Sequence, residues 1–173
     1  MTSTIIWERD AAIAQPVFFP VSIAKLLVMS VFTIGLYELY WFYENWKLVQ
    51  ARTRKRMMPF WRAFFALIWA EPLFKRVAAR ALDEGVRPVF SPSPMAGLFI
   101  LLTLSFKLPD PYSLVCFLSV IPLLRVQRAV IEINRRAAPD APVNAKFSAL
   151  NVAAAVIGGL VLALIILGSF LPE

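Results

Sequence analysis

Long apolar runs that end in basic residues make up most of this chain. Residues 149–171 contain no charged side chain. A helix of about 20 apolar residues crosses the ~30 Å hydrocarbon core of a bilayer, so residues 148–171 predict a transmembrane helix. Other apolar runs, each followed by Lys or Arg, occupy residues 17–43, 60–74, 95–106 and 112–124. The pattern predicts an all-α polytopic integral membrane protein with three or four crossing helices and a re-entrant or interfacial amphipathic segment.

The composition fits a single membrane domain over residues 1–173. Hydrophobic residues make up 60% of the chain and the mean hydropathy is +0.69, which is far more apolar than a soluble domain. The formal net charge of +7 would suggest nucleic acid as the partner of a soluble protein. Here the bases lie beside apolar runs, where anionic headgroups are the nearer partner. We therefore expect anionic membrane lipids, and no nucleic acid, as partners.

The chain offers little for metal, redox or hydrolytic chemistry. It contains no His and one Cys, Cys116, which lies inside an apolar run. Zinc, haem and iron–sulfur sites need more ligands than this, and the serines have no His to activate them. We expect no metal, no cofactor and no catalytic residue, and hence a protein that is not an enzyme.

Residues 21–46 predict the first apolar helix, after an N-terminal lead-in at residues 1–20. The run is long enough to cross a bilayer. Alternatively, Thr33, Ile34 and Gly35 form the tip of a re-entrant hairpin, because an uncharged tip costs much less in hydrocarbon than a charged one. We favour a span and leave the side of the N-terminus open.

Residues 57–85 predict helices that do not cross the membrane. Arg62 and Glu71 interrupt the apolar run and Pro72 follows, so the uninterrupted part is too short to span. Further on, Leu73, Val77 and Ala81 share one helical face and bases occupy the other, until Gly85 provides a credible C-cap. This pattern is typical of an amphipathic helix lying in the interface.

Residues 94–136 predict a helical hairpin with a basic extension. Ser93 and Pro94 are typical of an N-cap and a first helical position, and residues 107–111 predict the turn. If residues 57–85 do not cross, every loop base except Lys107 falls on one side of the membrane. The positive-inside rule prefers this arrangement, so we expect the turn and the end of the last helix to lie outside.

One spacing in the first run resembles a signature of uncharacterised bacterial multi-pass inner-membrane proteins, a family described as a domain of unknown function. The pattern K-x7-T-x-G-x-Y-x3-W-x-Y-x2-W falls on Lys25, Thr33, Gly35, Tyr37, Trp41, Tyr43 and Trp46. Residues 127–134 are also similar to a polar helix end in such proteins. The resemblance implies a location in the bacterial inner (cytoplasmic) membrane, and it brings no catalytic residues with it.

Ionisable side chains within apolar runs are functional candidates. Glu38 lies in the first run, and Arg62 and Glu71 lie in the second. Together they predict either a polar cavity for transport or, more simply, a buried Glu38–Arg62 ion pair. An interfacial Glu38 that reaches water is a further interpretation.

Two surfaces are candidates for contacts with lipid or protein. Bases near an anionic membrane contribute about 1 kcal/mol each to binding, and the candidates for lipid or partner binding are Lys47, Arg52, Arg54, Lys55, Arg56, Arg125, Arg128, Arg135 and Arg136. Small residues allow close helix packing, either within the chain or in an oligomer. In the last helix these are Ala155, Gly158, Gly159 and Ala163.

Three functions fit these features. The first is a non-enzymatic inner-membrane component that assembles with itself or with a larger envelope complex, with basic cytoplasmic surfaces that contact anionic lipid or a partner. The alternative is a small transporter or channel that uses Glu38, Arg62 and Glu71. A further alternative is a membrane-shaping wedge protein. The packing face, the basic segments and the missing catalytic groups favour the first.

Overall fold

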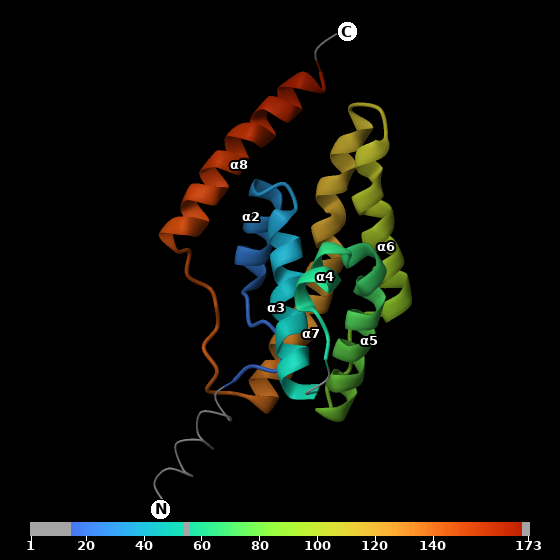
Figure 1. Ribbon diagram of the computed structural model, residues 1–173, viewed down its shortest axis with the longest axis vertical. Coiled ribbons are helices and arrows are strands. Elements are labelled where there is room, and N and C mark those ends of the chain that lie inside the picture. Colours follow the sequence, from blue (N-terminus) through green and yellow to red (C-terminus); the bar gives the residue numbers. More distant parts are fainter. Residues whose placement is uncertain (1–14, 54–55, 171–173) are drawn as a thin grey trace, which may run out of the picture.

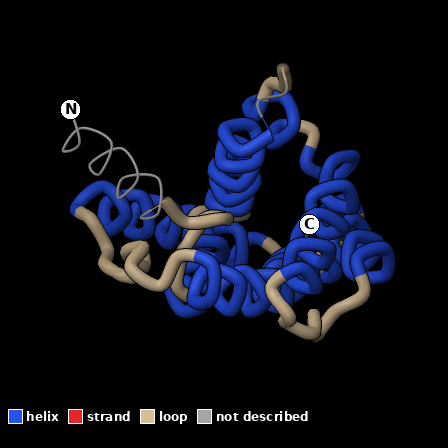
Figure 2. The backbone as a smooth tube through the Cα atoms, turned by 90° about the horizontal axis from the view of Figure 1, so that it is seen from below, coloured by secondary structure: helices blue, strands red, loops and turns tan. Residues whose placement is uncertain are grey.

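The computed structural model describes residues 15–53 and 56–170 (Figure 1), and this part of the chain consists of helices joined by loops, with no strand (Figure 2). The all-α prediction is confirmed. The elements are α2 (Ile23–Phe32), α3 (Leu36–Thr53), α4 (Pro59–Phe64), α5 (Ala66–Asp83), α6 (Pro92–Leu104), η1 (Ser105–Lys107), η2 (Tyr112–Ser119), α7 (Val120–Ala137) and α8 (Ala149–Gly168). Most of the lead-in predicted at residues 1–20 lies outside the described residues, as do Arg54 and Lys55.

The first apolar run is not one helix, so the single helix expected over residues 21–46 is wrong. Helix α2 ends at Phe32 and the chain reverses through a turn in which Ile34 and Gly35 have φ values of 53° and 80°. The Gly35 N–H donates to the Ser30 carbonyl at 2.8 Å. This is the 6→1 hydrogen bond of a Schellman C-cap. With 10 residues, α2 is about 15 Å long, half of what a crossing needs.

The Thr33 side chain joins the two helices of this hairpin. Its hydroxyl donates to the Met29 carbonyl of α2 at 2.6 Å and accepts from the Tyr37 N–H of α3 at 3.0 Å. One side chain therefore satisfies a terminal carbonyl of one helix and a terminal N–H of the next. The sequence alternative of a hairpin with a Thr-Ile-Gly turn describes this backbone correctly.

Residues 57–85 form a short helix, α4, and a longer one, α5. The face formed by Leu73, Val77 and Ala81 is fully buried, as the periodicity predicts. Gly85 has φ 68° and Val86 N–H donates to the Ala81 carbonyl at 2.7 Å, so the predicted C-cap is also confirmed. Pro72 lies inside α5 without ending it.

The hairpin predicted at residues 94–136 is present, but it begins earlier. Ser91 is the N-cap of α6 and Pro92 is its first residue. Figure 1 places the turn between α6 and η2 at one end of the bundle and the C-terminal ends of α3 and α7 at the other. Two helices, Tyr112–Ala137 and Ala149–Gly168, are long and apolar enough to cross a membrane.

The core lies where α3, α5 and α7 meet. Its largest fully buried side chains include Trp41, Phe42 and Trp46 of α3, Phe74 of α5 and Leu123 of α7. Helix α8 lies at the edge of this core and leans across the α2–α3 turn (Figure 1). None of the described residues of α8 is buried, and its N-terminus is closed by a capping box between Ser148 and Asn151.

Candidate functional site

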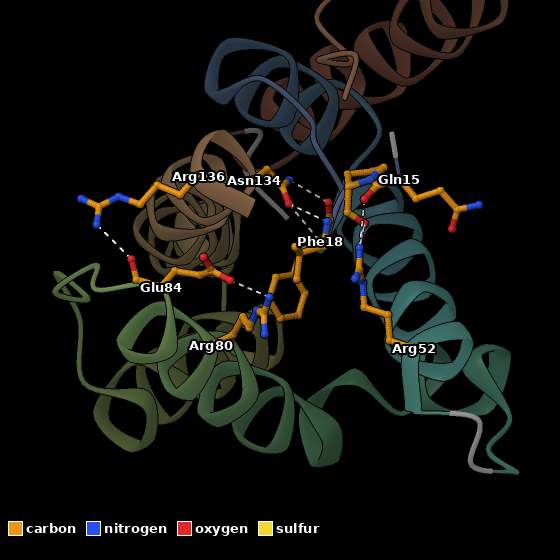
Figure 3. A network of polar contacts seen from close by, with 9 residues as sticks. Gln15, Phe18, Arg52, Arg80, Glu84, Asn134 and Arg136 are labelled. Carbon is orange, nitrogen blue, oxygen red and sulfur yellow. Dashed lines mark hydrogen bonds and ion pairs between the residues drawn. The ribbon is translucent and has the colours of Figure 1, made fainter. Parts of the chain in front are cut away.

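A segment outside the helices, residues 15–21, runs between α3 and α7 and is held by a buried asparagine. Asn134 Oδ1 accepts from the backbone N–H groups of Val17 and Phe18 at 2.8 and 3.1 Å, and its Nδ2 donates to the Phe18 carbonyl at 2.8 Å. From the other side, Arg52 donates to the Gln15 and Pro16 carbonyls (Figure 3). The segment thus has the backbone partners that a neighbouring strand would supply.

Two more buried amides complete this arrangement. Asn45 Oδ1 accepts from Phe19 N–H at 3.1 Å. Gln127 Nε2 donates to the carbonyls of Phe19 and Val21 at 3.1 and 2.7 Å. The Trp41 indole N–H closes the network by donating to Gln127 Oε1 at 2.7 Å. We call Asn45, Gln127 and Asn134 the amide clamp.

The amide clamp was missed by the sequence reasoning, although a signal for it exists. Gln127 and Asn134 are seven residues apart, so they lie on one face of α7 among apolar neighbours. A buried amide without partners is costly, so two amides on an apolar stripe indicate that polar backbone must lie against them. That signal says nothing of which segment supplies the backbone.

The three ionisable candidates in the apolar runs do not meet. Glu38 is buried and accepts from the Ser119 hydroxyl at 3.0 and 3.1 Å. The Arg62 guanidinium instead stacks between two indoles, 4.5 Å from the Trp46 ring and 4.1 Å from the Trp69 ring. The predicted Glu38–Arg62 ion pair is therefore wrong.

Glu71 belongs to a surface contact between α5 and α6. Its carboxylate pairs with Lys75 at 2.8 Å and accepts from the Ser93 hydroxyl at 2.7 Å. These two hydrogen bonds hold the pKa of Glu71 below its ordinary value. Ser93, expected as an N-cap, therefore binds a side chain rather than the helix end.

Glu38 lies beside a cavity of about 480 Å³ between the α2–α3 turn, α6 and η2. Ser119 and Cys116 also line this cavity, as does Ser30, whose hydroxyl has no partner among the described residues. Arg62 and Glu71 do not line it. A transport site built from all three ionisable residues therefore lacks a common cavity.

The predicted basic surface divides into bases with partners and bases that face outward. Arg52 holds the segment at residues 15–21, Lys47 pairs with Glu44 at 3.3 Å, and Arg135 and Arg136 both bind Glu132. Arg136 also donates to the Glu84 carbonyl at 2.9 Å (Figure 3). The outward-facing bases, with no ion pair or side-chain hydrogen bond to another described residue, are Arg56, Arg125 and Arg128.

The small residues of α8 pack within the chain at two positions. A Cβ placed on Gly158 would lie 1.9 Å from the Phe32 carbonyl oxygen, and one on Gly159 would lie 3.0 Å from the Phe32 ring. Ala155 packs against the core, whereas Ala163 is exposed. Close packing through Gly158 and Gly159 is present, with α2 as the partner.

Comparisons with known proteins add no family. No family model matches the sequence, and no curated protein or solved structure matches it. The resemblance carried by the spacing from Lys25 to Trp46 stays a prediction. Within the described residues, no cluster of His, Cys, Asp and Glu is placed to hold a metal ion.

Proposed function

We propose that this chain is a non-enzymatic membrane component that assembles, with a second copy or with another membrane protein, through the outward face of α8. The observation that carries this proposal is the position of α8. None of its described residues is buried, whereas the other long apolar helix, Tyr112–Ala137, is nearly half buried in the bundle. Lipid alone could cover such a helix. A helix that packs on its own chain along one side only, however, offers its other side to a partner.

The proposed topology places α8 fully in the bilayer. The hairpin built from α6, η1, η2 and α7 crosses it, as does α8, and α2 and α3 enter and return on one side as a re-entrant hairpin. The bases at the C-terminal ends of α3, α5 and α7 then face the cytoplasm of a bacterial inner membrane, as the positive-inside rule favours. Exposed aromatic side chains cluster on α4 and directly after it, at Phe60, Trp61, Phe64 and Phe65, and they suit a helix lying at the interface.

The outward face of α8 is the side of the helix opposite Gly158. Val156, Leu160 and Leu164 lie there, with 58%, 65% and 68% of their surfaces exposed. Because lipid tails are as apolar as leucine, association in the bilayer depends on side-chain packing rather than on the hydrophobic effect. Shortening these side chains should therefore weaken assembly and leave insertion intact.

The test is native mass spectrometry of the full chain extracted gently from its own membrane. We expect a complex with more than one subunit, which the double variant Leu160→Ala/Leu164→Ala converts largely to the single chain. The matched control is Leu101→Ala/Leu104→Ala, because these leucines are also exposed but lie on α6. A single chain in the wild type, or equal loss of subunits in both variants, would overturn the proposal.

A second candidate function rests on Glu38. A buried carboxylate that borders a cavity and has no cationic partner among the described residues is a candidate ion or proton site. In liposomes, Glu38→Gln should abolish flux, while Glu71→Gln on the surface should not. Wild-type flux no higher than that of empty liposomes would exclude this function.

A further inference from the structure

A large cavity lies between α8 and the α2–α3 hairpin. Its volume is about 980 Å³. It extends from the loop before α8, where Asn144 and Lys146 line it, to the contact region of Gly158. In Figure 1, the first turns of α8 diverge from α2 on this side. The cavity therefore lies along the face of α8 that is turned toward the rest of the chain.

The end of the cavity near the loop is positively charged. Lys25 is only 3% exposed, and its ammonium donates to Asn144 Oδ1 and to the Lys146 carbonyl, both at 2.7 Å. An ammonium has three donors, so these contacts leave one for a ligand. Lys146 adds a second positive charge to the lining. No carboxylate occurs among the described residues that line the cavity, so these two charges call for an anion.

A buried hydroxyl behind the cavity wall has no partner among the described residues. Tyr37 is 6% exposed and lines the cavity, and its hydroxyl makes no hydrogen bond to any described residue. Leaving a buried hydroxyl without a partner costs about 1–3 kcal/mol. The hydroxyl oxygen is itself buried, so an occupant of the cavity meets the ring of Tyr37 rather than this oxygen.

The rest of the lining is apolar. Met29 and Ile34 line it from the hairpin, and Leu150, Ala154, Ile157 and Val161 line it from α8. From Leu150 to Val161 the wall is about 16 Å long, which accommodates most of an acyl chain. The cavity thus suits an amphiphile. Its positive end matches an anionic group, and its apolar wall matches a hydrocarbon chain.

We propose that this cavity binds one anionic phospholipid of the bilayer, with its phosphate at Lys25 and Lys146 and an acyl chain along α8. A helix from a second copy fits less well, because an apolar helix would leave Lys25 and Lys146 at one end of the cavity without an anion. This site is separate from the outward face through which the chain is proposed to assemble.

The test uses the full chain in nanodiscs of phosphatidylcholine and phosphatidylglycerol in equal amounts, released and weighed by native mass spectrometry. Wild-type protein should retain one phosphatidylglycerol per chain in preference to phosphatidylcholine. Ala154→Phe fills the cavity and should lose the bound lipid. Ala153→Phe adds the same ring to the exposed side of α8 and should retain it.

A second variant tests the headgroup without changing the apolar wall. Lys146 is exposed, so Lys146→Gln should leave the fold intact and lower the preference for phosphatidylglycerol about fivefold, which corresponds to the ~1 kcal/mol expected for one base. Equal lipid retention by Ala154→Phe and Ala153→Phe, or no headgroup preference in the wild type, would overturn the lipid site. A change in subunit number with Ala154→Phe at unchanged lipid content would assign the cavity to a second copy instead. Lipid number tests this site and subunit number tests the proposed assembly, so either can fail alone.

Discussion

Gly158 of α8 lies directly against the backbone carbonyl of Phe32 at the end of α2, so close that a Cβ at this position would sit 1.9 Å from the carbonyl oxygen. This contact attaches α8 to the α2–α3 hairpin. It also fixes the orientation of the helix: one side faces the hairpin and the opposite side faces outward. The cavity and the proposed assembly face both follow from that orientation.

The first prediction is that Gly158→Ala destabilises the chain. The added methyl group must displace α8 from α2, and overpacking of this kind costs about 1–3 kcal/mol. Gly97→Ala is the control, because a Cβ there meets nothing within 4 Å and Ala favours the helix by up to ~1 kcal/mol. Thermal unfolding in detergent should show a lower Tm for Gly158→Ala and not for Gly97→Ala. An unchanged Tm for Gly158→Ala would rule out this packing.

A second prediction concerns the α2–α3 turn. Ile34 has φ 53°, a left-handed conformation that costs a β-branched residue about 1–2 kcal/mol. Ile34→Gly should therefore raise the stability, whereas Ile68→Gly, in the exposed face of α5, should lower it by about 1 kcal/mol. Chemical denaturation of both variants measures whether the free energy of unfolding rises or falls in each. Loss of stability in both would mean that the chain does not turn at Ile34.

The amide clamp supports a third prediction. Asn134→Leu leaves the N–H groups of Val17 and Phe18 and the Phe18 carbonyl without their partner, and each unsatisfied buried group costs about 1–3 kcal/mol. We expect lower stability and faster proteolysis within residues 15–21. Arg128→Leu, an exposed change on the same helix, serves as the control. If proteolysis is equally slow in both variants, Asn134 does not hold this segment.

A fourth prediction concerns acid stability. The pKa of Glu71 is lowered in the folded state by its hydrogen bonds to Lys75 and Ser93. A lowered folded pKa gives stability that is present above the unfolded value of about 4.3 and is lost as the pH falls through the folded pKa. In a plot of the free energy of unfolding against pH, Glu71→Gln should therefore make the acid limb, the fall in stability at low pH, less steep. Asp140→Asn, in an exposed loop, should leave that limb steep. An acid limb that is as steep in Glu71→Gln as in the wild type would argue against the contact.

Much of the helical framework could be predicted from the sequence, because apolar periodicity and caps act locally. The buried face of α5, the Gly85 cap and the last helix were all predicted correctly. The break after Phe32 could not be decided in this way, since Thr33, Ile34 and Gly35 carry no charge and a helix that spans the membrane tolerates all three. The turn depends on backbone torsion angles and on the Thr33 hydroxyl rather than on polarity.

The candidate site was less predictable, because partners far apart in sequence decide it. Glu38 and Arg62 suggest an ion pair by charge alone, yet two indoles take Arg62 and Ser119 takes Glu38. Lys25 and Tyr37, which belong to the spacing from Lys25 to Trp46, line a cavity only because α8 returns to cover them. No local pattern in the sequence specifies that return.

The most direct test of the central claim is site-specific photo-crosslinking in the native membrane. Benzoylphenylalanine replaces Leu160 on the outward face of α8 or, as the matched control, Leu101 on α6; both leucines are exposed. If the chain assembles through α8, illumination yields one covalent protein adduct of defined mass with the probe at position 160 and none with the probe at position 101. No protein adduct at position 160, or the same adducts at both positions, would contradict the account.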